Sequence, residues 1–135
     1  MNSIIYFNTA IFLFLAGLHF YWMTGGRWGI EAAVPATSDH SLVFNPGKWG
    51  TLVVALGLVA FAAITFAHNF HFELDVPHYL RYVIAFIFLI RTIGDFRYVG
   101  IFRKINNTVF ARYDRQYYVP LCGYLAVSEF FLAAY

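Results

Sequence analysis

Two long apolar runs occupy the first half of the chain. Residues 4–23 form a stretch of twenty without a formally charged side chain, and residues 50–67 form a second stretch of eighteen. At about 1.5 Å per residue, each run is long enough to cross most or all of a hydrocarbon core of roughly 30 Å. Each run therefore predicts a membrane-spanning helix. We expect the first to be retained, because Met1, Asn2 and Ser3 supply no basic residue of the kind that begins a cleaved signal peptide.

The second half of the chain predicts two further spans. Its apolar stretch from Tyr82 to Ile90 is too short to cross alone, so a third span over residues 80–98 has to include Arg91 and Asp95. The i, i+4 spacing of these two residues allows them to pair on one helix face. A fourth span is expected over residues 117–135. The predicted fold class is therefore all-α, a four-helix transmembrane bundle that forms a single integral membrane domain.

Shorter signals refine this picture. Residues 24–49 are rich in glycine and proline, which predicts an irregular loop. In the later loop, Thr108 is placed to cap a short helix. On the second span, the small residues Gly57, Ala60 and Ala63 would permit close packing against another helix.

The composition supports a membrane protein and excludes several other classes. Hydrophobic residues make up 61% of the 135-residue chain and charged residues 12%, whereas typical soluble domains carry about 45–50% and about 25%. The net charge of +2 comes with no basic stripe, so no nucleic-acid partner is predicted. The single cysteine, Cys122, cannot form an intramolecular disulfide. Membrane lipids are the expected partners, and the pattern is also compatible with a homo-oligomer or a larger membrane complex.

The distribution of basic residues predicts an orientation. Seven of them lie in or beside the loops that follow the first and third spans, whereas Arg81 alone lies beside the connection between the second and third. Basic residues accumulate on the cytoplasmic side of membrane proteins. We therefore expect the loops at residues 24–49 and 98–117 to be cytoplasmic and both termini to lie outside.

Polar residues near the predicted cytoplasmic face are the candidate chemistry. Charged groups at membrane depth cost roughly 2.5–3.5 kcal/mol each on insertion scales, so they tend to face the protein interior. By helical rise, His19 and Asp95 lie at a similar depth, where they could exchange protons while Arg91 holds an anion. The candidate ligand-binding residues of this predicted chamber are His19, Trp22, Arg27, Arg91, Asp95 and Arg97.

A second polar layer is expected nearer the outer face. Asn8 lies eleven residues before His19, close to three helical turns, so both side chains project from one stripe of the first span. Glu129, the one charged residue of the fourth span, lies at the depth of Asn8. Glu129 is therefore an alternative site for coupling to a proton or a cation.

No metal site and no cofactor are predicted. The spacing of His68, His71, Glu73, Asp75 and His78 is a weak metal-ligand signal, and a solvated turn is the commoner explanation of such a group. The sequence contains no nucleophile motif, no phosphate-binding glycine loop and no dinucleotide fingerprint. Catalytic residues are therefore left unassigned.

Several motifs resemble a known family. They are His19, Tyr21-Trp22, Gly25-Gly26, Trp28-Gly29, Pro35, Arg91, Gly94-Asp95-Phe96-Arg97-Tyr98-Val99-Gly100, Thr108, Phe110-Ala111, Asp114, Tyr117 and Pro120-Leu121-Cys122. In these motifs (GGxWG and RxxGDFRYVG among them) the chain resembles a family of bacterial membrane proteins of about this length, known only as a domain of unknown function. The resemblance covers most of the chain and is weakest over the second span and the outer turn. It implies a four-span bundle in a bacterial inner (cytoplasmic) membrane and no activity, and it does not include Glu129.

Four interpretations of function follow from these residues. The first is that the chamber binds an amphipathic lipid-like or isoprenoid-like molecule. The second is an enzyme acting on such a lipid, with His19 as the general base and Asp95 orienting it. The third is a homo-oligomeric transporter of a small solute, or one coupled to protons, that uses Glu129. The fourth is a non-catalytic accessory subunit in which the polar groups only lock the bundle together.

Overall fold

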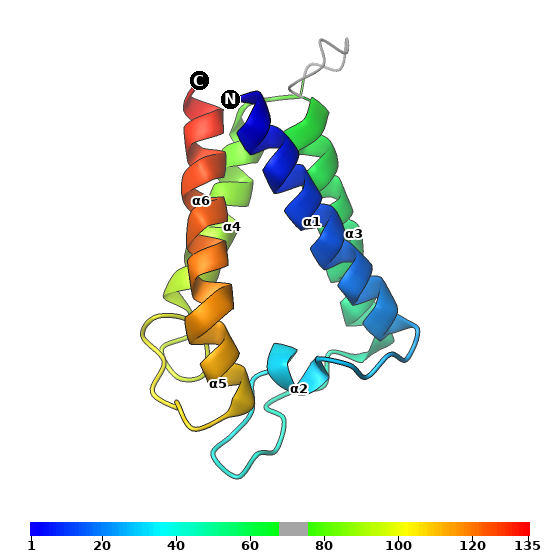
Figure 1. The fold of residues 1–135 in the computed structure, drawn as a ribbon, viewed down its shortest axis with the longest axis vertical. Coiled ribbons are helices and arrows are strands. Elements are labelled where there is room, and N and C mark those ends of the chain that lie inside the picture. Colours follow the sequence, from blue (N-terminus) through cyan, green and yellow to red (C-terminus); the bar gives the residue numbers. More distant parts are fainter. Residues whose placement is uncertain (68–75) are drawn as a thin grey trace. The chain divides into compact units, whose positions relative to one another are not determined.

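The computed structural model describes residues 1–67 and 76–135, and helices dominate this part of the chain (Figure 1). In order they are α1 (Asn2–Met23), α2 (Ile30–Ala33), α3 (Gly47–Ala67), α4 (Tyr79–Ile93), α5 (Val109–Tyr113), the π-helical segment η1 (Asp114–Tyr118) and α6 (Val119–Ala134). The β pairing in the described residues is an isolated bridge between Ala36 and Leu42 in the first loop. The expectation of an all-α fold is confirmed for these residues.

Three helical stretches in the described residues are long and apolar enough to cross a membrane. They are α1, α3 and the continuous segment Val109–Ala134, which contains α5, η1 and α6. The two predicted spans in the first half of the chain therefore coincide with α1 and α3. Helix α4 has 15 residues and is about 22 Å long, which is shorter than a hydrocarbon core of roughly 30 Å.

The third predicted span differs from the structure at its carboxyl end. A helix was expected to reach residue 98, but α4 ends at Ile93. Gly94 follows in the left-handed region with φ +85°, and its N–H donates to the Ile90 carbonyl at 2.8 Å, as in a glycine C-terminal cap. A side chain at Gly94 would clash with the Val99 carbonyl, because the loop doubles back on itself there. Asp95 therefore lies beyond the helix.

The last helical segment begins earlier than residue 117. Thr108 caps it, since its Oγ1 accepts a hydrogen bond from the Ala111 N–H at 3.0 Å, which confirms the predicted cap. Segment η1 widens the helix into a π-turn that ends at Tyr118, two residues before Pro120. A proline lacks the N–H that an α-helix needs and its ring clashes with the carbonyl four residues earlier, so a π-turn is a favourable solution at this point.

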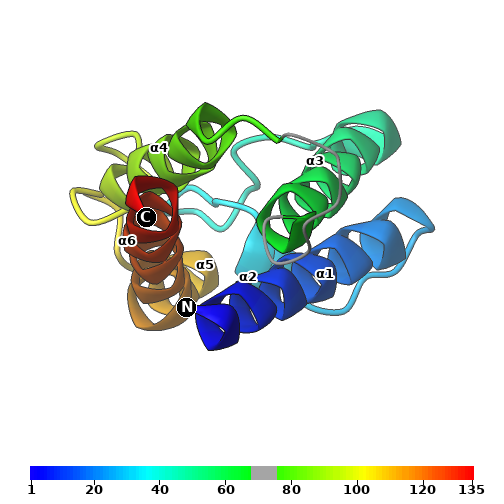
Figure 2. The ribbon, with the colours of Figure 1, turned by 90° about the horizontal axis from the view of Figure 1, so that it is seen from above.

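The described chain divides into two compact units. The first unit consists of Met1–Gly26, Pro46–Ile84 and Ser128–Tyr135, and the second consists of Arg27–Asn45 and Ala85–Val127. Helices α1 and α3 belong to the first unit and lie side by side (Figures 1 and 2). The second unit contains α2, most of α4, α5, η1 and the first half of α6.

The core of the first unit follows helical periodicity. On α1 the buried stripe consists of Ile5, Asn8, Phe12 and Ala16, and on α3 it consists of Thr51, Ala55, Leu58, Ala62 and Thr65. Spacings of three and four residues place each set on one helix face. The small residues on that face of α3 are Ala55 and Ala62. The three small residues named from the sequence are not part of this buried face, since Ala60 and Ala63 are exposed and Gly57 is half-buried.

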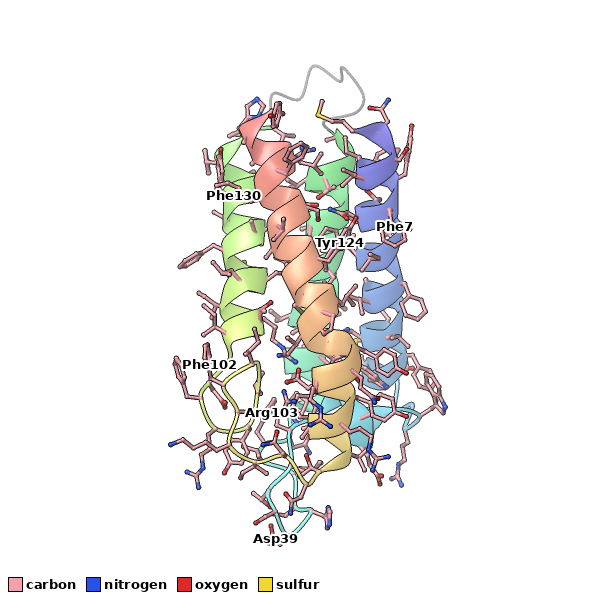
Figure 3. All side chains as sticks on the ribbon, turned by 60° about the vertical axis from the view of Figure 1, so that its left-hand side comes forward. Phe7, Asp39, Phe102, Arg103, Tyr124 and Phe130 are labelled. Carbon is pink, nitrogen blue, oxygen red and sulfur yellow. The ribbon has the colours of Figure 1, made fainter. Side chains whose placement is uncertain are left out.

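Large apolar side chains cover the outer surfaces of the helices. Phe7 on α1 and Phe130 on α6 point away from their helices (Figure 3) and are 58% and 59% exposed. Exposed apolar side chains spread over whole helices are unusual for a protein surrounded by water. They are expected where the solvent is lipid.

Candidate functional site

In the second unit, the partner of Arg91 is Asp114, at the start of η1. The Arg91 Nη2 atom lies 2.8 Å from Asp114 Oδ1. The other carboxylate oxygen, Oδ2, accepts from Arg103 Nη1 at 2.9 Å and from the Gly100 N–H at 2.8 Å. The predicted pairing of Arg91 with Asp95 is therefore wrong, because the helix that would have aligned them ends before Asp95.

We call Arg91, Gly100, Arg103 and Asp114 the Asp114 cluster. Asp114 is fully buried, and two guanidinium groups share its single carboxylate, so the cluster carries one positive charge in excess. Arg91 Nη1 is buried and has no hydrogen-bond partner among the described residues, while the Arg91 side chain as a whole is 31% exposed. The guanidinium also lies over the Phe110 ring, 5.9 Å from its centroid. An unpaired donor on a half-exposed cation is suited to an anionic oxygen.

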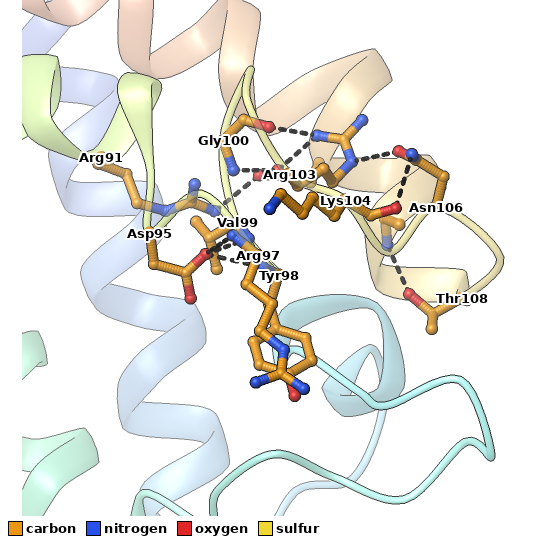
Figure 4. Close-up of polar contacts among 12 residues, drawn as sticks. Arg91, Asp95, Arg97, Tyr98, Val99, Gly100, Arg103, Lys104, Asn106 and Thr108 are labelled. Carbon is orange, nitrogen blue, oxygen red and sulfur yellow. Dashed lines mark hydrogen bonds and ion pairs between the residues drawn. The ribbon is translucent and has the colours of Figure 1, made fainter.

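Asp95 holds the start of the loop after α4, the loop in which the Gly100 N–H reaches Asp114. Its Oδ1 accepts from the backbone N–H groups of Arg97, Tyr98 and Val99 at 2.7–2.9 Å (Figure 4). Partial burial disfavours the charged form, but the three N–H donors outweigh this effect and hold the pKa of Asp95 below its ordinary value. Asp95 thus has a clear role in holding the loop.

The same loop presents aromatic and basic side chains together. Phe96 adopts a left-handed conformation with φ 64° and stacks on Phe102, with ring centroids 5.9 Å apart. Both rings are exposed, and so are Arg97 and Lys104. The Arg97 guanidinium lies over the Tyr98 ring, 5.1 Å from its centroid. Exposed aromatic rings between basic side chains are typical of segments at a membrane surface.

The remaining candidates of the predicted chamber belong to different units. His19 and Trp22 belong to the first unit, where their rings contact edge to face at 5.1 Å and His19 Nδ1 lies 2.7 Å from the Leu15 carbonyl oxygen. Arg27 belongs to the second unit and is exposed. Among the described residues, the structure therefore brings His19 to Trp22 and Asp95 to the backbone of Arg97.

In the first unit, Glu129 and Asn8 meet, so the prediction that they share a layer is confirmed. Glu129 Oε1 accepts from Asn8 Nδ2 at 2.8 Å and from Thr65 Oγ1 at 3.1 Å. Asn8 Nδ2 also donates to Ser128 Oγ at 2.9 Å. Arg81 lies near the start of α4, is buried and donates to the carbonyls of Thr65 and Leu132.

Three charged residues of these two clusters were not among the candidate site residues predicted from the sequence: Arg81, Arg103 and Asp114. Asp114 had a signal, since it is an isolated acid in a basic segment that contains Arg103, Arg112 and Arg115. Arg81 had a weaker one, because it is a lone base beside an apolar helix. Arg103 could not be separated from its basic neighbours by sequence, because its burial results from the fold of the loop.

The weak metal-ligand group lies largely outside the described residues, which omit 68–75. Its described member, His78, is exposed. Within residues 1–67 and 76–135 there is no group of three or more metal-ligating side chains. Cys122 is buried and not in a disulfide.

Comparison with known proteins identifies the family of the chain. Neither a curated protein nor a solved structure matches the chain. The model of the family described as "Protein of unknown function (DUF3995)" matches residues 12–128. Because this match covers most of the chain, the protein belongs to that family of unknown function.

Proposed function

We propose that the protein is a four-span integral membrane protein of the bacterial cytoplasmic membrane, in which α4 crosses the membrane in addition to the three longer helical stretches. The large apolar side chains of α4 that are exposed support this, since they suit contact with lipid: Val83, Phe86, Ile87, Leu89 and Ile90. The loop that follows α4 begins with charged and aromatic residues, which can reach the headgroup region from a short helix. The distribution of Lys and Arg favours cytoplasmic loops at residues 24–49 and 98–117 and termini outside.

Within this architecture, we infer that the Asp114 cluster binds the anionic headgroup of an amphipathic, lipid-like or isoprenoid-like molecule. The observation that carries the inference is the buried Nη1 of Arg91, which has no partner among the described residues. Asp114 holds the guanidinium in place through Nη2, so Nη1 is oriented before a ligand arrives. A phosphate or carboxylate oxygen would satisfy it and would offset the excess positive charge.

The surroundings of the cluster suit the rest of such a ligand. Seven of the nine Lys and Arg residues lie in the second unit, which favours an anion. Phe110 provides an apolar wall beside Arg91, and the exposed rings of Phe96 and Phe102 lie on the adjoining loop. In this proposal Arg27 and Arg97, which belong to the same unit as the cluster, add positive charge.

An enzyme acting on a lipid of this class is a second candidate, and one observation favours it. A carbonyl oxygen can only accept, so the contact with Leu15 O places a proton on His19 Nδ1. In the neutral ring this leaves Nε2 with a lone pair, as a general base requires. Asp95 binds the backbone of its own loop through Oδ1, and its predicted role in orienting His19 stays a prediction.

Mass spectrometry of lipids retained by gently purified protein tests the binding proposal. The informative variant is Arg91→Lys, which keeps a cation for Asp114 but loses the two-pronged guanidinium. Arg112→Lys is the matched control, because Arg112 is exposed on α5 and outside the cluster. His19→Ala tests the second candidate, the enzyme.

We expect one anionic lipid species to co-purify with the parent and with Arg112→Lys. Its retention should fall about tenfold in Arg91→Lys, which corresponds to about 1.4 kcal/mol of binding. A chemical change in that lipid which disappears in His19→Ala would favour the enzyme. Bulk phospholipid alone, identical in every variant, would contradict the binding site.

A further inference from the structure

Four helical segments of the first unit bring polar groups to Glu129. Asn8 comes from α1, Thr65 from α3, Arg81 from the start of α4, and Ser128 lies beside Glu129 on α6. Asn8, Thr65 and Glu129 have no exposed surface, and Arg81 is 2% exposed. We call these five residues the Glu129 cluster. Polar and ionisable groups are costly inside a membrane protein, so such a cluster calls for a chemical explanation.

The hydrogen bonds of the cluster leave two acceptor oxygens without a donor. The two donors that reach Glu129, from Asn8 Nδ2 and Thr65 Oγ1, both bind Oε1. Glu129 Oε2 and Asn8 Oδ1 are buried and have no hydrogen-bond partner among the described residues. An unsatisfied buried acceptor costs about 1–3 kcal/mol, and more when the group is charged. The cluster therefore lacks a donor on one side of the carboxylate.

Arg81 does not supply that donor. Its Nη1 donates to the Leu132 carbonyl at 3.1 Å and its Nη2 to the Thr65 carbonyl at 2.9 Å. In the described residues no ion pair within 4.0 Å joins Arg81 to Glu129, although the charge of Arg81 acts on that carboxylate. From α1 and α3 the groups that face Glu129 are the uncharged Asn8 and Thr65. Arg81 is thus the nearby charged group that compensates an ionised Glu129.

We propose that Glu129 is a proton-binding site, which takes up and releases a proton at Oε2. Binding forms one O–H bond on an Oε2 lone pair, release breaks it to give a hydrated proton, and no electrons are transferred. The new O–H is the donor that this side of the cluster lacks. Protonation changes the net charge of Arg81 and Glu129 together from zero to one positive charge. This inference concerns the first unit and does not depend on the anion site.

A proton fits these groups better than a metal ion does. Hard cations such as Ca²⁺ take about 6–8 oxygen ligands, and Mg²⁺ requires an octahedral set. The cluster offers two oxygens without donors, and no group of three or more metal-ligating side chains occurs in the described residues. A metal ion would also add its charge close to Arg81 without forming the missing O–H donor.

Infrared titration of the purified full-length protein tests the proposal directly. A protonated carboxyl has a C=O band that its carboxylate lacks, and the band can be followed as the pH is lowered and raised again. Glu129→Gln removes the titrating group but keeps an amide of the same shape. Glu31→Gln is the matched control, because Glu31 is an exposed acid on α2.

We expect a band that appears and disappears reversibly with pH while the protein stays folded. It should be present in the parent and in Glu31→Gln and absent from Glu129→Gln. Identical spectra for the parent and Glu129→Gln at every pH would overturn the proposal. So would a band assigned to Glu129 that does not change with pH.

A second variant keeps the test decisive if Glu129→Gln fails to fold. Thr65→Val removes one of the two donors to Oε1 and therefore weakens the carboxylate form. The carboxylic-acid band of this variant should persist to a higher pH than in the parent, by about 0.5–1 pH unit. An unchanged midpoint in Thr65→Val would contradict the assignment of the band to Glu129.

Discussion

At the scale of single residues, Asp114 is the shared anionic partner of two guanidinium groups. Arg103 is 5% exposed and Arg91 31% exposed at the side chain, while Asp114 is fully buried. The same carboxylate accepts from the Gly100 N–H, so it joins the loop after α4 to the π-helical segment η1. The contribution of Asp114 is therefore both electrostatic and architectural.

The first prediction concerns the loss of this carboxylate. Asp114→Ala leaves two buried or half-buried cations without an anionic partner, which should lower the free energy of unfolding by about 3–5 kcal/mol. Thermal and denaturant unfolding of the protein in detergent would measure the change. Arg112→Ala, an exposed change in the adjoining α5, should unfold like the parent. If Asp114→Ala also unfolds like the parent, the cluster does not form.

The second prediction is a pH dependence at Asp95. The pKa of Asp95 is lowered in the folded protein, so its carboxylate stabilises the fold at neutral pH. That contribution is complete above the ordinary value of 3.8 and is lost as the pH falls through the lowered pKa. Asp95→Asn should therefore cost about 0.5–1.5 kcal/mol at neutral pH. At a pH well below 3.8 it should cost much less.

Unfolding free energies of the parent and Asp95→Asn at both pH values would check this. Glu31→Gln controls for the loss of an exposed carboxylate elsewhere in the second unit. A cost that stays constant between the two pH values would show that the charge of Asp95 does not hold the loop.

At the scale of elements, two glycines allow α4 to end and the following loop to return. Gly94 and Gly100 have φ values of +85° and +87°. Their backbones lie against each other, and this contact closes the loop between them. A side chain on either residue would meet backbone atoms, which cannot move aside as the tip of a flexible side chain can. The close approach places the Gly100 N–H on Asp114.

The third prediction compares a glycine in the tight loop after α4 with a glycine inside helix α3. Gly94→Ala should destabilise the protein strongly, by several kcal/mol, because it combines a left-handed backbone with a steric clash. Gly57→Ala is the matched control, since Gly57 lies within α3 with open space around its Cα. In a helix interior this change should be neutral or stabilise by roughly 0.5–1 kcal/mol. Equal unfolding temperatures for the two variants would contradict the loop geometry.

At the scale of the whole molecule, the orientation in the membrane is the main open consequence of the proposal. The fourth prediction places both termini outside and the first loop inside. In a Cys122→Ser background, Ser38→Cys should react with a membrane-impermeant maleimide only after the cells are opened. Ser3→Cys should react in intact cells. Both positions are exposed, so a reversed labelling pattern would overturn the orientation without a change of fold.

Several features of the fold followed from the local sequence. Helices α1 and α3 could be placed by the length of their apolar runs, since a span is a property of one continuous segment. The Thr108 cap is equally local, because donor and acceptor are three residues apart. The shared layer of Asn8 and Glu129 could be found as well, since helical rise sets the depth of a residue once the span is known.

Other features depended on contacts between residues far apart in the chain. The spacing of Arg91 and Asp95 favoured a pair, but that rule requires a helix that continues, and Gly94 ends it. The actual partner, Asp114, lies 23 residues away, and the carbonyl that Arg81 binds on Leu132 lies 51 residues away. Helical spacing rules relate residues three or four positions apart, so they cannot identify partners that are 23 or 51 residues apart in the sequence. Burial of these charges is decided by how the helices and loops pack, because each charged group is placed by partners from other segments.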